Sequence, residues 1–342
     1  MIRFFANANY DFIKWRRVAF TVTGLIMLAG AIDLVARGLN YSIEFTGGTL
    51  VQFEVKHKVP IGNVRLSLDN VGLHGAEVYN FGADTSYVVR ARLGAAAAED
   101  EAGTQAVADS VAKALDHSVG AGEYQISRRE AVRPKVGREL QGKALIAILF
   151  SFVVTLIYLA FRFEWRFGLA AVVATAHDVI ATVAFISLMR LEVSLVVVGA
   201  VLTVVGYSLN DTIIIFDRVR ENLRKYRRQN LYEILNLSIN ETLPRSVLTH
   251  GTTIATTLSL LLLAGEVIRP FAWVMSFGIF TGTFSSIYIA APVLLWIEKR
   301  WPGEDARGAR TFGARPATGS TPPAASPVSP AAPSSRTPQP TR

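Results

Sequence analysis

Six long apolar stretches constrain this chain more than any other feature of its sequence. Each is about long enough to cross the ~30 Å hydrocarbon core of a bilayer as a helix. Hydrophobic residues make up 51% of the chain and charged residues only 18%, against about one quarter charged in a soluble domain. The sequence therefore predicts a polytopic α-helical membrane protein with a six-helix transmembrane bundle, whose spans cover about residues 18–36, 144–161, 168–189, 193–216, 246–265 and 270–297.

The distribution of charge predicts how the chain crosses the membrane. Lysine and arginine are concentrated before the first span and after the second, fourth and sixth spans, which all lie on one side if the spans alternate. The segment 37–142 is close to neutral, with 12 Lys/Arg against 13 Asp/Glu. By the positive-inside rule, residues 1–17 and 299–342 are cytoplasmic and 37–142 is extracytoplasmic. A contact with lipid headgroups or ribosomal RNA is the alternative explanation for the arginine runs.

The segment between the first two spans has the pattern of a compact α+β domain. Alternating apolar residues predict strands, and helical periodicity predicts two helices between them. The resulting order, β-α-β-β-α-β, is that of a ferredoxin-like unit. Residues 302–342 differ in kind, because nine of the fourteen prolines lie there among small residues. We expect the tail, 299–342, to be disordered.

Few polar side chains lie within the predicted spans, and each is a functional candidate because burying a charge in hydrocarbon is costly. Asp211, beside Asn210, lies in the fourth span. Arg245 follows Pro244, which we place in the first turn of the fifth span, where its missing N–H has no cost. The arginine side chain can then extend toward Asp211. The alternative for Asp211 is a purely structural hydrogen bond between helices.

His177 and Asp178 lie near the middle of the third span and are weaker candidates of the same kind. A structural role is the main alternative for Asp178, and a lone histidine on an apolar helix is most often a core residue. Small residues predict where helices approach closely. They recur at helical spacing in two spans: Gly199, Thr203, Gly206 and Asn210 in the fourth, and Gly278, Gly282, Ser285 and Ser286 in the sixth.

Several kinds of chemistry are missing from the sequence. It has no cysteine and five scattered histidines, so we expect neither thiol chemistry nor a metal site. It has no phosphate-binding loop, nucleophile elbow or HExxH motif. We therefore expect no catalytic residue, no enzyme activity and no cofactor, and any energy coupling must use an ion gradient.

The remaining motifs resemble those of the SecD/SecF family of protein-export membrane proteins, over about residues 10–298. The similar segments are EFTGG at 44–48, with Gly47 and Gly48; VGREL at 136–140, with Gly137; AHDV at 176–179; VGYSLNDTIIIFDRVREN at 205–222; NETLPRS at 240–246; and GTFSSI at 282–287. The string at 205–222 is the most specific of them.

This resemblance implies a subunit of the bacterial protein-export machinery in the inner membrane. Its partners would be SecD, the SecYEG channel, the accessory proteins YajC and YidC, the unfolded preprotein and the lipid bilayer, but no nucleic acid. The transmembrane arrangement would resemble one half of a resistance-nodulation-division (RND) transporter. Protons would be the coupling ion, and the family's proton-pathway positions map onto Asp211 and Arg245.

Two other functions remain open at this point. One is a half-size, proton-coupled RND-type exporter of lipids or small molecules. The other is a structural assembly factor without ion coupling. The single small extracytoplasmic domain favours the export subunit over the exporter, because RND exporters usually carry a much larger extracytoplasmic portion and a second homologous half.

Overall fold

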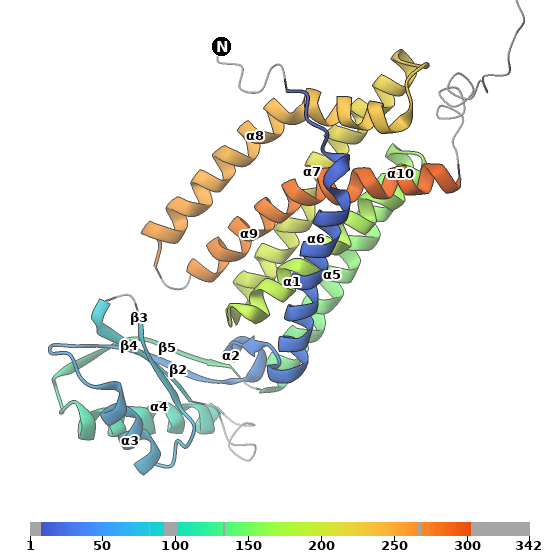
Figure 1. The fold of residues 1–342 in the computed structure, drawn as a ribbon. Helices are drawn as coiled ribbons and strands as arrows, with labels where there is room; N and C mark the ends of the chain where they lie inside the picture. Colours follow the sequence, from blue (N-terminus) through green and yellow to red (C-terminus); the bar gives the residue numbers. More distant parts are fainter. Residues whose placement is uncertain (1–7, 82, 92–100, 133, 266–267, 302–342) are drawn as a thin grey trace, which may run out of the picture.

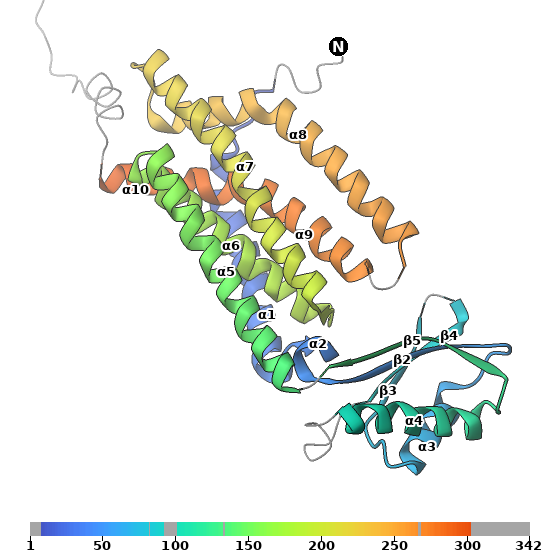
Figure 2. The same cartoon turned by 180° about the vertical axis from the view of Figure 1, so that it is seen from behind.

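The computed structural model describes residues 8–81, 83–91, 101–132, 134–265 and 268–301; most of the predicted disordered tail thus lies outside the described residues. A bundle of long helices carries a smaller α+β domain at one end (Figure 1). Figure 2 shows the same arrangement from behind. The helices are α1 (Arg16–Arg37), α2 (Ile43–Thr46), α3 (Ile61–Asn70), α4 (Glu101–Ser118), α5 (Pro134–Arg162), α6 (Trp165–Leu188), α7 (Leu195–Lys225), α8 (Leu231–Leu263), α9 (Arg269–Ser285) and α10 (Ala291–Arg300).

Six helical segments in the described part of the chain are long and apolar enough to cross a membrane. They are α1, extended at its start by a turn of 3₁₀ helix (Ile13–Trp15), α5, α6, α7, α8 and the pair α9–α10, which a π-helical segment (Ser286–Ala290) joins. The share of buried residues is 72% in the last span but 6% in α5. The last span, α6 and α7 therefore form the centre of the bundle, and α1, α5 and α8 lie around it.

The prediction that the fifth helix begins at Pro244 is wrong. Helix α8 begins at Leu231 behind a capping box, in which the Asn230 side chain accepts from the Glu233 N–H and Glu233 accepts from the Asn230 N–H. Pro244 therefore lies inside the helix and not in its first turn. Hydropathy missed the first turns because they are too polar to resemble a membrane span, although Ile234 and Ile239 pack into the bundle core.

The α+β domain has the predicted element order. Its strands are β2 (Gly48–Val55), β3 (Glu77–Phe81), β4 (Ala83–Ala91) and β5 (Tyr124–Val132), in the sheet order β3-β4-β2-β5 with every neighbouring pair antiparallel. Helices α3 and α4 cover one face of the sheet and bury an apolar core with it. The opposite face is turned toward the membrane helices (Figure 1). The chain is therefore a six-span membrane protein with an α+β domain between its first two spans.

A short junction fixes the α+β domain to the bundle. Strands β1 (Asn40–Tyr41) and β6 (Glu192–Val193), which the sequence analysis did not predict, pair in parallel although they are far apart in the chain. The adjacent α2 ends at Thr46 and is followed by Gly47 and Gly48, whose φ angles of 76° and 142° favour glycine. The backbone then passes directly from the junction into β2.

Gly137 lets the first turn of α5 lie directly against α2. A Cβ atom at this position would be 2.5 Å from the Phe45 carbonyl oxygen and 2.8 Å from its carbonyl carbon. Both atoms belong to the backbone, so neither can rotate away. The Gln141 side chain donates to the same Phe45 oxygen at 3.3 Å, which holds the two helices in this register.

We predict that Gly137→Ala weakens the junction. The added methyl group must push α5 away from α2, at an expected cost of about 1–3 kcal/mol in the free energy of unfolding. Thermal unfolding of the full chain in detergent measures this loss. Gly142→Ala is the matched control, because a Cβ there has no atom within 4 Å and alanine is the better helix former. Equal unfolding temperatures for the two variants would contradict the proposed contact.

Candidate functional site

The most buried carboxylate of the bundle is Asp178, in the middle of α6. Its exposed fraction is 0%, and it accepts hydrogen bonds from hydroxyl groups on two other helices. Ser285 of α9 donates to its Oδ2 at 2.6 Å, and Ser208 of α7 donates to the same atom. The Nδ1 atom of His177 lies 3.1 Å from its other oxygen. Asp178 thus joins three central helices through one side chain.

Close packing of α9 on α7 brings these groups together. A Cβ at Gly278 would lie 2.2 Å from a methyl of Val204, and one at Gly282 would lie 3.1 Å from the Cβ of Ser208. The two glycines therefore bring the backbones close enough for the serine hydroxyls of both helices to reach Asp178. Immediately afterwards the helix changes to its π-helical segment, a departure from regular geometry that often occurs at functional sites.

A second carboxylate, Asp211, lies at the contact between α7 and α8. It is 3% exposed, and its Oδ1 accepts a 2.5 Å hydrogen bond from Ser246. Its Oδ2 is buried and has no hydrogen-bond partner among the described residues, and the same holds for Nδ1 of His250, one turn after Ser246. The ring of Tyr207 contacts His250 edge-on, with 5.4 Å between the centroids. Unlike Asp178, Asp211 keeps an oxygen available for a proton or a water molecule.

The predicted partners of Asp211 do not surround it in this conformation. Arg245 is exposed and forms no ion pair with Asp211 in the part of the chain that the structure describes. Successive helical residues point about 100° apart, so when Ser246 faces Asp211, Arg245 points away from it. Because α8 is one continuous helix through Pro244, the directions of Ser246 and Arg245 are set by the orientation of the whole helix. Asn210 is also exposed and lies on the outer face of α7.

Sequence reasoning missed the actual neighbours of both carboxylates. Ser246 and His250 lie four residues apart, on one face of α8, and that spacing was the available signal. Ser208 lies one turn before Thr212, whose hydroxyl contacts that of Ser286 at 2.8 Å. Serine and histidine are too common for their positions to identify partners before the helix packing is known.

The small residues of α7 were predicted to lie where helices approach closely, but two of its glycines do not lie at a contact between described helices. An added Cβ at Gly199 or Gly206 would have no atom within 4 Å, so none of the described helices packs against these two positions. Thr203, which is exposed, and Thr256, on the exposed side of α8, donate to carbonyls of their own helices. We call this exposed face of α7 and α8 the polar stripe, defined by Thr203, Gly206, Asn210, Thr252 and Thr256. It lies open beside Asp211.

An ion pair connects the α+β domain to the short segment between α6 and α7. Arg90 of β4 is 3% exposed and forms ion pairs with Glu77 of β3 and with Glu192, in the loop between α6 and α7. Burial raises the pKa of the Glu192 carboxyl, and the Arg90 guanidinium opposes that shift. Glu192 lies between α6, which carries Asp178, and α7, which carries Asp211, so this ion pair joins the sheet to the segment that connects those two helices.

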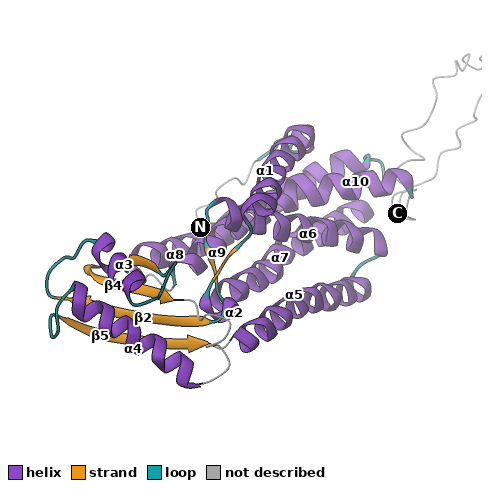
Figure 3. Ribbon diagram, turned by 90° about the horizontal axis from the view of Figure 1, so that it is seen from below, coloured by secondary structure: helices purple, strands orange, loops and turns teal. Residues whose placement is uncertain are grey.

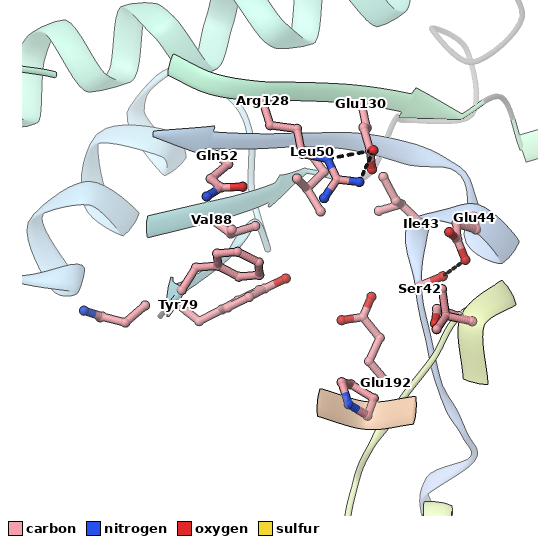
Figure 4. A pocket seen from close by; sticks show the side chains of 15 residues that line it. Ser42, Ile43, Glu44, Leu50, Gln52, Tyr79, Val88, Arg128, Glu130 and Glu192 are labelled. Atoms are coloured by element: carbon pink, nitrogen blue, oxygen red, sulfur yellow. Dashed lines mark hydrogen bonds and ion pairs between the residues drawn. The ribbon is translucent and has the colours of Figure 1, made fainter. Parts of the chain in front are cut away.

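A pocket of about 250 Å³ lies at this junction, between the open face of the sheet and the outer ends of the membrane helices (Figure 4). Glu44 from α2 lies at its edge and accepts a 2.6 Å hydrogen bond from the backbone N–H of Leu195. A carboxylate at this position stabilises the N-terminus of α7. No cluster of three or more potential metal ligands occurs among the residues that the structure describes.

We predict that Asp178 is needed for stability. Asp178→Ala removes the acceptor for two buried serines and a histidine, so we expect a loss of about 2–4 kcal/mol in the free energy of unfolding. Unfolding of the full chain in mixed micelles measures it. Thr203→Ala, on the polar stripe, is the control and should change stability by about 0.5 kcal/mol or less. An Asp178→Ala protein as stable as this control would contradict the assignment.

Comparison with known proteins adds independent findings. Residues 111–300 match the family described as protein export membrane protein SecD/SecF, C-terminal, and residues 34–59 match the SecD/SecF GG motif. The chain is 55% identical over 317 residues to the protein translocase subunit SecF of Gemmatimonas aurantiaca, covering 92% of this chain and 95% of that protein. It is 38% identical to SecF of Escherichia coli O157:H7 over 286 residues, covering 84% and 87%.

Two solved structures have the same fold. SecDF from Thermus thermophilus, described as a translocon-associated membrane protein, superposes with a TM-score of 0.74 at 34% identity. SecDF in a super-membrane-facing form superposes with a TM-score of 0.63, also at 34% identity. The matches cover 86% and 90% of this chain but only 39% and 40% of the SecDF chains. This chain therefore spans about two fifths of those larger proteins.

Proposed function

Since this chain belongs to the SecF branch of the SecD/SecF family of protein translocase subunits, we propose that it acts with SecD to drive late steps of protein export through SecYEG with the proton gradient. Protons are the coupling ion, and the subunit needs no other cofactor and catalyses no chemical reaction. YajC and YidC are further partners in this proposal, and the unfolded preprotein is the substrate. The relatives favour this function over the RND-type exporter, which shares only the scaffold.

The observation that carries the proposal is the half-satisfied Asp211. A buried carboxylate oxygen without a hydrogen-bond donor is costly, and protonation lowers that cost because it removes the negative charge. The neighbouring Ser246 and His250 supply further polar atoms in the contact between α7 and α8. A rearrangement of the contact between α7 and α8 that brings the Arg245 guanidinium closer to Asp211 would change the proton affinity of the acid. Each proton crossing the membrane supplies ~2.3 kcal/mol per 100 mV of potential.

The polar stripe supports SecD as the neighbour of this face. Asn210 and the backbone of Gly206 lie exposed at membrane depth, where lipid offers no hydrogen-bond partner. The SecDF chains contain a second portion larger than the part matched here, and a SecD subunit would supply that portion. A six-helix partner on this face would enclose Asp211 between two half-bundles.

The junction is the proposed route from proton to preprotein. Rearrangement at Asp211 moves α7, and the ion pair of Glu192 with Arg90 carries that movement to the sheet. The α+β domain would then change its tilt relative to the membrane. In this scheme Asp178 keeps the central helices together while α7 and α8 rearrange.

The proposed orientation of the chain in the membrane is based on the distribution of its basic residues. We place both termini in the cytoplasm and the α+β domain in the periplasm, in the bacterial inner membrane. The connection between α7 and α8 carries Arg227 and Arg228 at the end of the bundle opposite the α+β domain, which agrees with the positive-inside rule.

Labelling of single cysteines tests this orientation, because the native chain has no cysteine. Lys113→Cys on α4 and Arg227→Cys after α7 both introduce exposed thiols. In intact spheroplasts a membrane-impermeant maleimide should label the first and leave the second unlabelled until the membrane is permeabilised. The reverse pattern would contradict the proposed orientation.

Asp211→Asn tests the proton role. The amide keeps the size of the side chain and can still accept the Ser246 hydrogen bond, but it cannot carry a proton. We expect the variant to assemble at normal levels and to lose the proton-driven part of preprotein translocation into inverted membrane vesicles. The measurement is the translocation rate with and without an uncoupler.

Asp33→Asn is the matched control, since Asp33 is a carboxylate at the outer end of α1 that accepts from Ser187 at 2.8 Å. It makes the same chemical change away from α7 and α8 and should keep most of the uncoupler-sensitive rate. If Asp211→Asn vesicles translocate at the native rate and remain sensitive to the uncoupler, Asp211 has only a structural role.

A further inference from the structure

The last turns of α5 and α7 lie at the end of the bundle remote from the α+β domain (Figure 2). A basic cavity lies between them. Its volume is about 550 Å³, and its lining is entirely charged: Arg162, Asp217, Arg220, Glu221, Arg224 and Lys225. None of these side chains takes part in the site around Asp211. We call these residues the basic cluster.

Two arginines of the basic cluster are held in place by the same neighbours. Arg162 and Arg220 approach the two oxygens of Asp217 at 2.5 and 3.9 Å. Their guanidinium groups also lie 5.1 and 5.7 Å from the centre of the Phe163 ring. The Nε atom of Arg220 is buried without a hydrogen-bond partner in the described part of the chain. Two like charges are therefore positioned side by side with one carboxylate between them.

The remaining acid does not balance this charge. Glu221 is held by Arg218, which contacts it at 2.6 Å and also contacts Glu241 at 2.7 Å. Arg224 and Lys225 are exposed and have no ion pair among the described contacts. Four cationic side chains thus line the cavity against two carboxylates, so positive charge is in excess. An anion in the cavity would relieve this repulsion.

Aromatic residues place the basic cluster at the level of the lipid headgroups. Trp165, three residues after Arg162, contacts Trp301, and Trp301 contacts Trp296, with 6.2 Å between ring centres in each pair. All three are 48–63% exposed, and exposed tryptophans of this kind mark the membrane interface.

Helix α5 presents an apolar surface to the lipid directly beside the basic cluster. Ile157 and Phe161 are 51% and 90% exposed there, and few residues of this helix are buried. A ligand at this place therefore meets positive charge at one end and an apolar helix surface next to it.

We propose that the basic cluster binds the phosphate of an anionic phospholipid whose acyl chains lie along α5. The phosphate would accept hydrogen bonds from the paired guanidinium groups of Arg162 and Arg220, whose donors suit this geometry. Arg224 and Lys225 would add attraction from the rim. RNA is a poorer fit, because it requires an extended basic surface, whereas this charge surrounds one cavity beside apolar surface.

Native mass spectrometry of the full chain in detergent tests the proposal, with phosphatidylglycerol and phosphatidylcholine of identical acyl chains as probes. We expect the protein to retain phosphatidylglycerol preferentially. Arg224→Gln with Lys225→Gln should lower this retention about thirtyfold, since each charge near the surface contributes a factor of about five. Both residues are exposed, so the variant should fold normally. Arg220→Gln should weaken retention independently.

The control is Lys299→Gln with Arg300→Gln, which removes the same charge from exposed positions at the end of α10. It should retain phosphatidylglycerol like the native chain. Equal retention of the two lipids, or equal losses in the control and the Arg224/Lys225 variant, would overturn the proposal. Displacement of the lipid by inorganic phosphate or by a short RNA at equal concentration would also overturn it, because the cavity would then prefer a soluble anion.

Discussion

Burial of carboxylates in an apolar bundle is the constraint on which the rest of this structure depends. Lipid cannot solvate Asp178 or Asp211, so other helices must provide their hydrogen-bond donors. Gly278 and Gly282 make this possible for Asp178, because they allow α9 to approach α7 until serines from both helices reach one oxygen. The same two glycines therefore allow the close packing of the central helices and bring the hydrogen-bond donors of Asp178 within reach.

The two carboxylates are satisfied to different degrees, and this difference is the basis for the different roles that we propose for them. Asp178 has donors on both oxygens and connects three helices, as a structural residue should. Asp211 has a donor on one oxygen and lies where α7 meets α8, a peripheral helix. A buried polar group with an unmet hydrogen bond is costly in a low-dielectric interior, which is why we propose Asp211 as the group that takes up a proton. In the proposed mechanism, the ion pair of Arg90 with Glu192 would carry such a change to the α+β domain.

Charge at the two ends of the bundle has different structural uses. At the α+β end, Arg90 is almost completely buried and is balanced by Glu77 and Glu192. At the other end, the basic cluster has more cations than carboxylates and lies among exposed tryptophans. The first arrangement holds the α+β domain against the membrane helices of the same chain. The second is incomplete without an anion, and the membrane surface is the nearest source of one.

The sequence alone determined the six spans, the order of elements in the α+β domain, the family and the two membrane carboxylates, because hydropathy, periodicity and local motifs record these directly. It could not determine the course of α8, since its polar first turns are buried only by contact with the rest of the bundle. The direction of Arg245, the role of Ser246 and the parallel pairing of β1 with β6 depend on residues far apart in the chain. Only the tertiary structure decides them, because helix rotation and strand pairing are set by packing between elements and not within them.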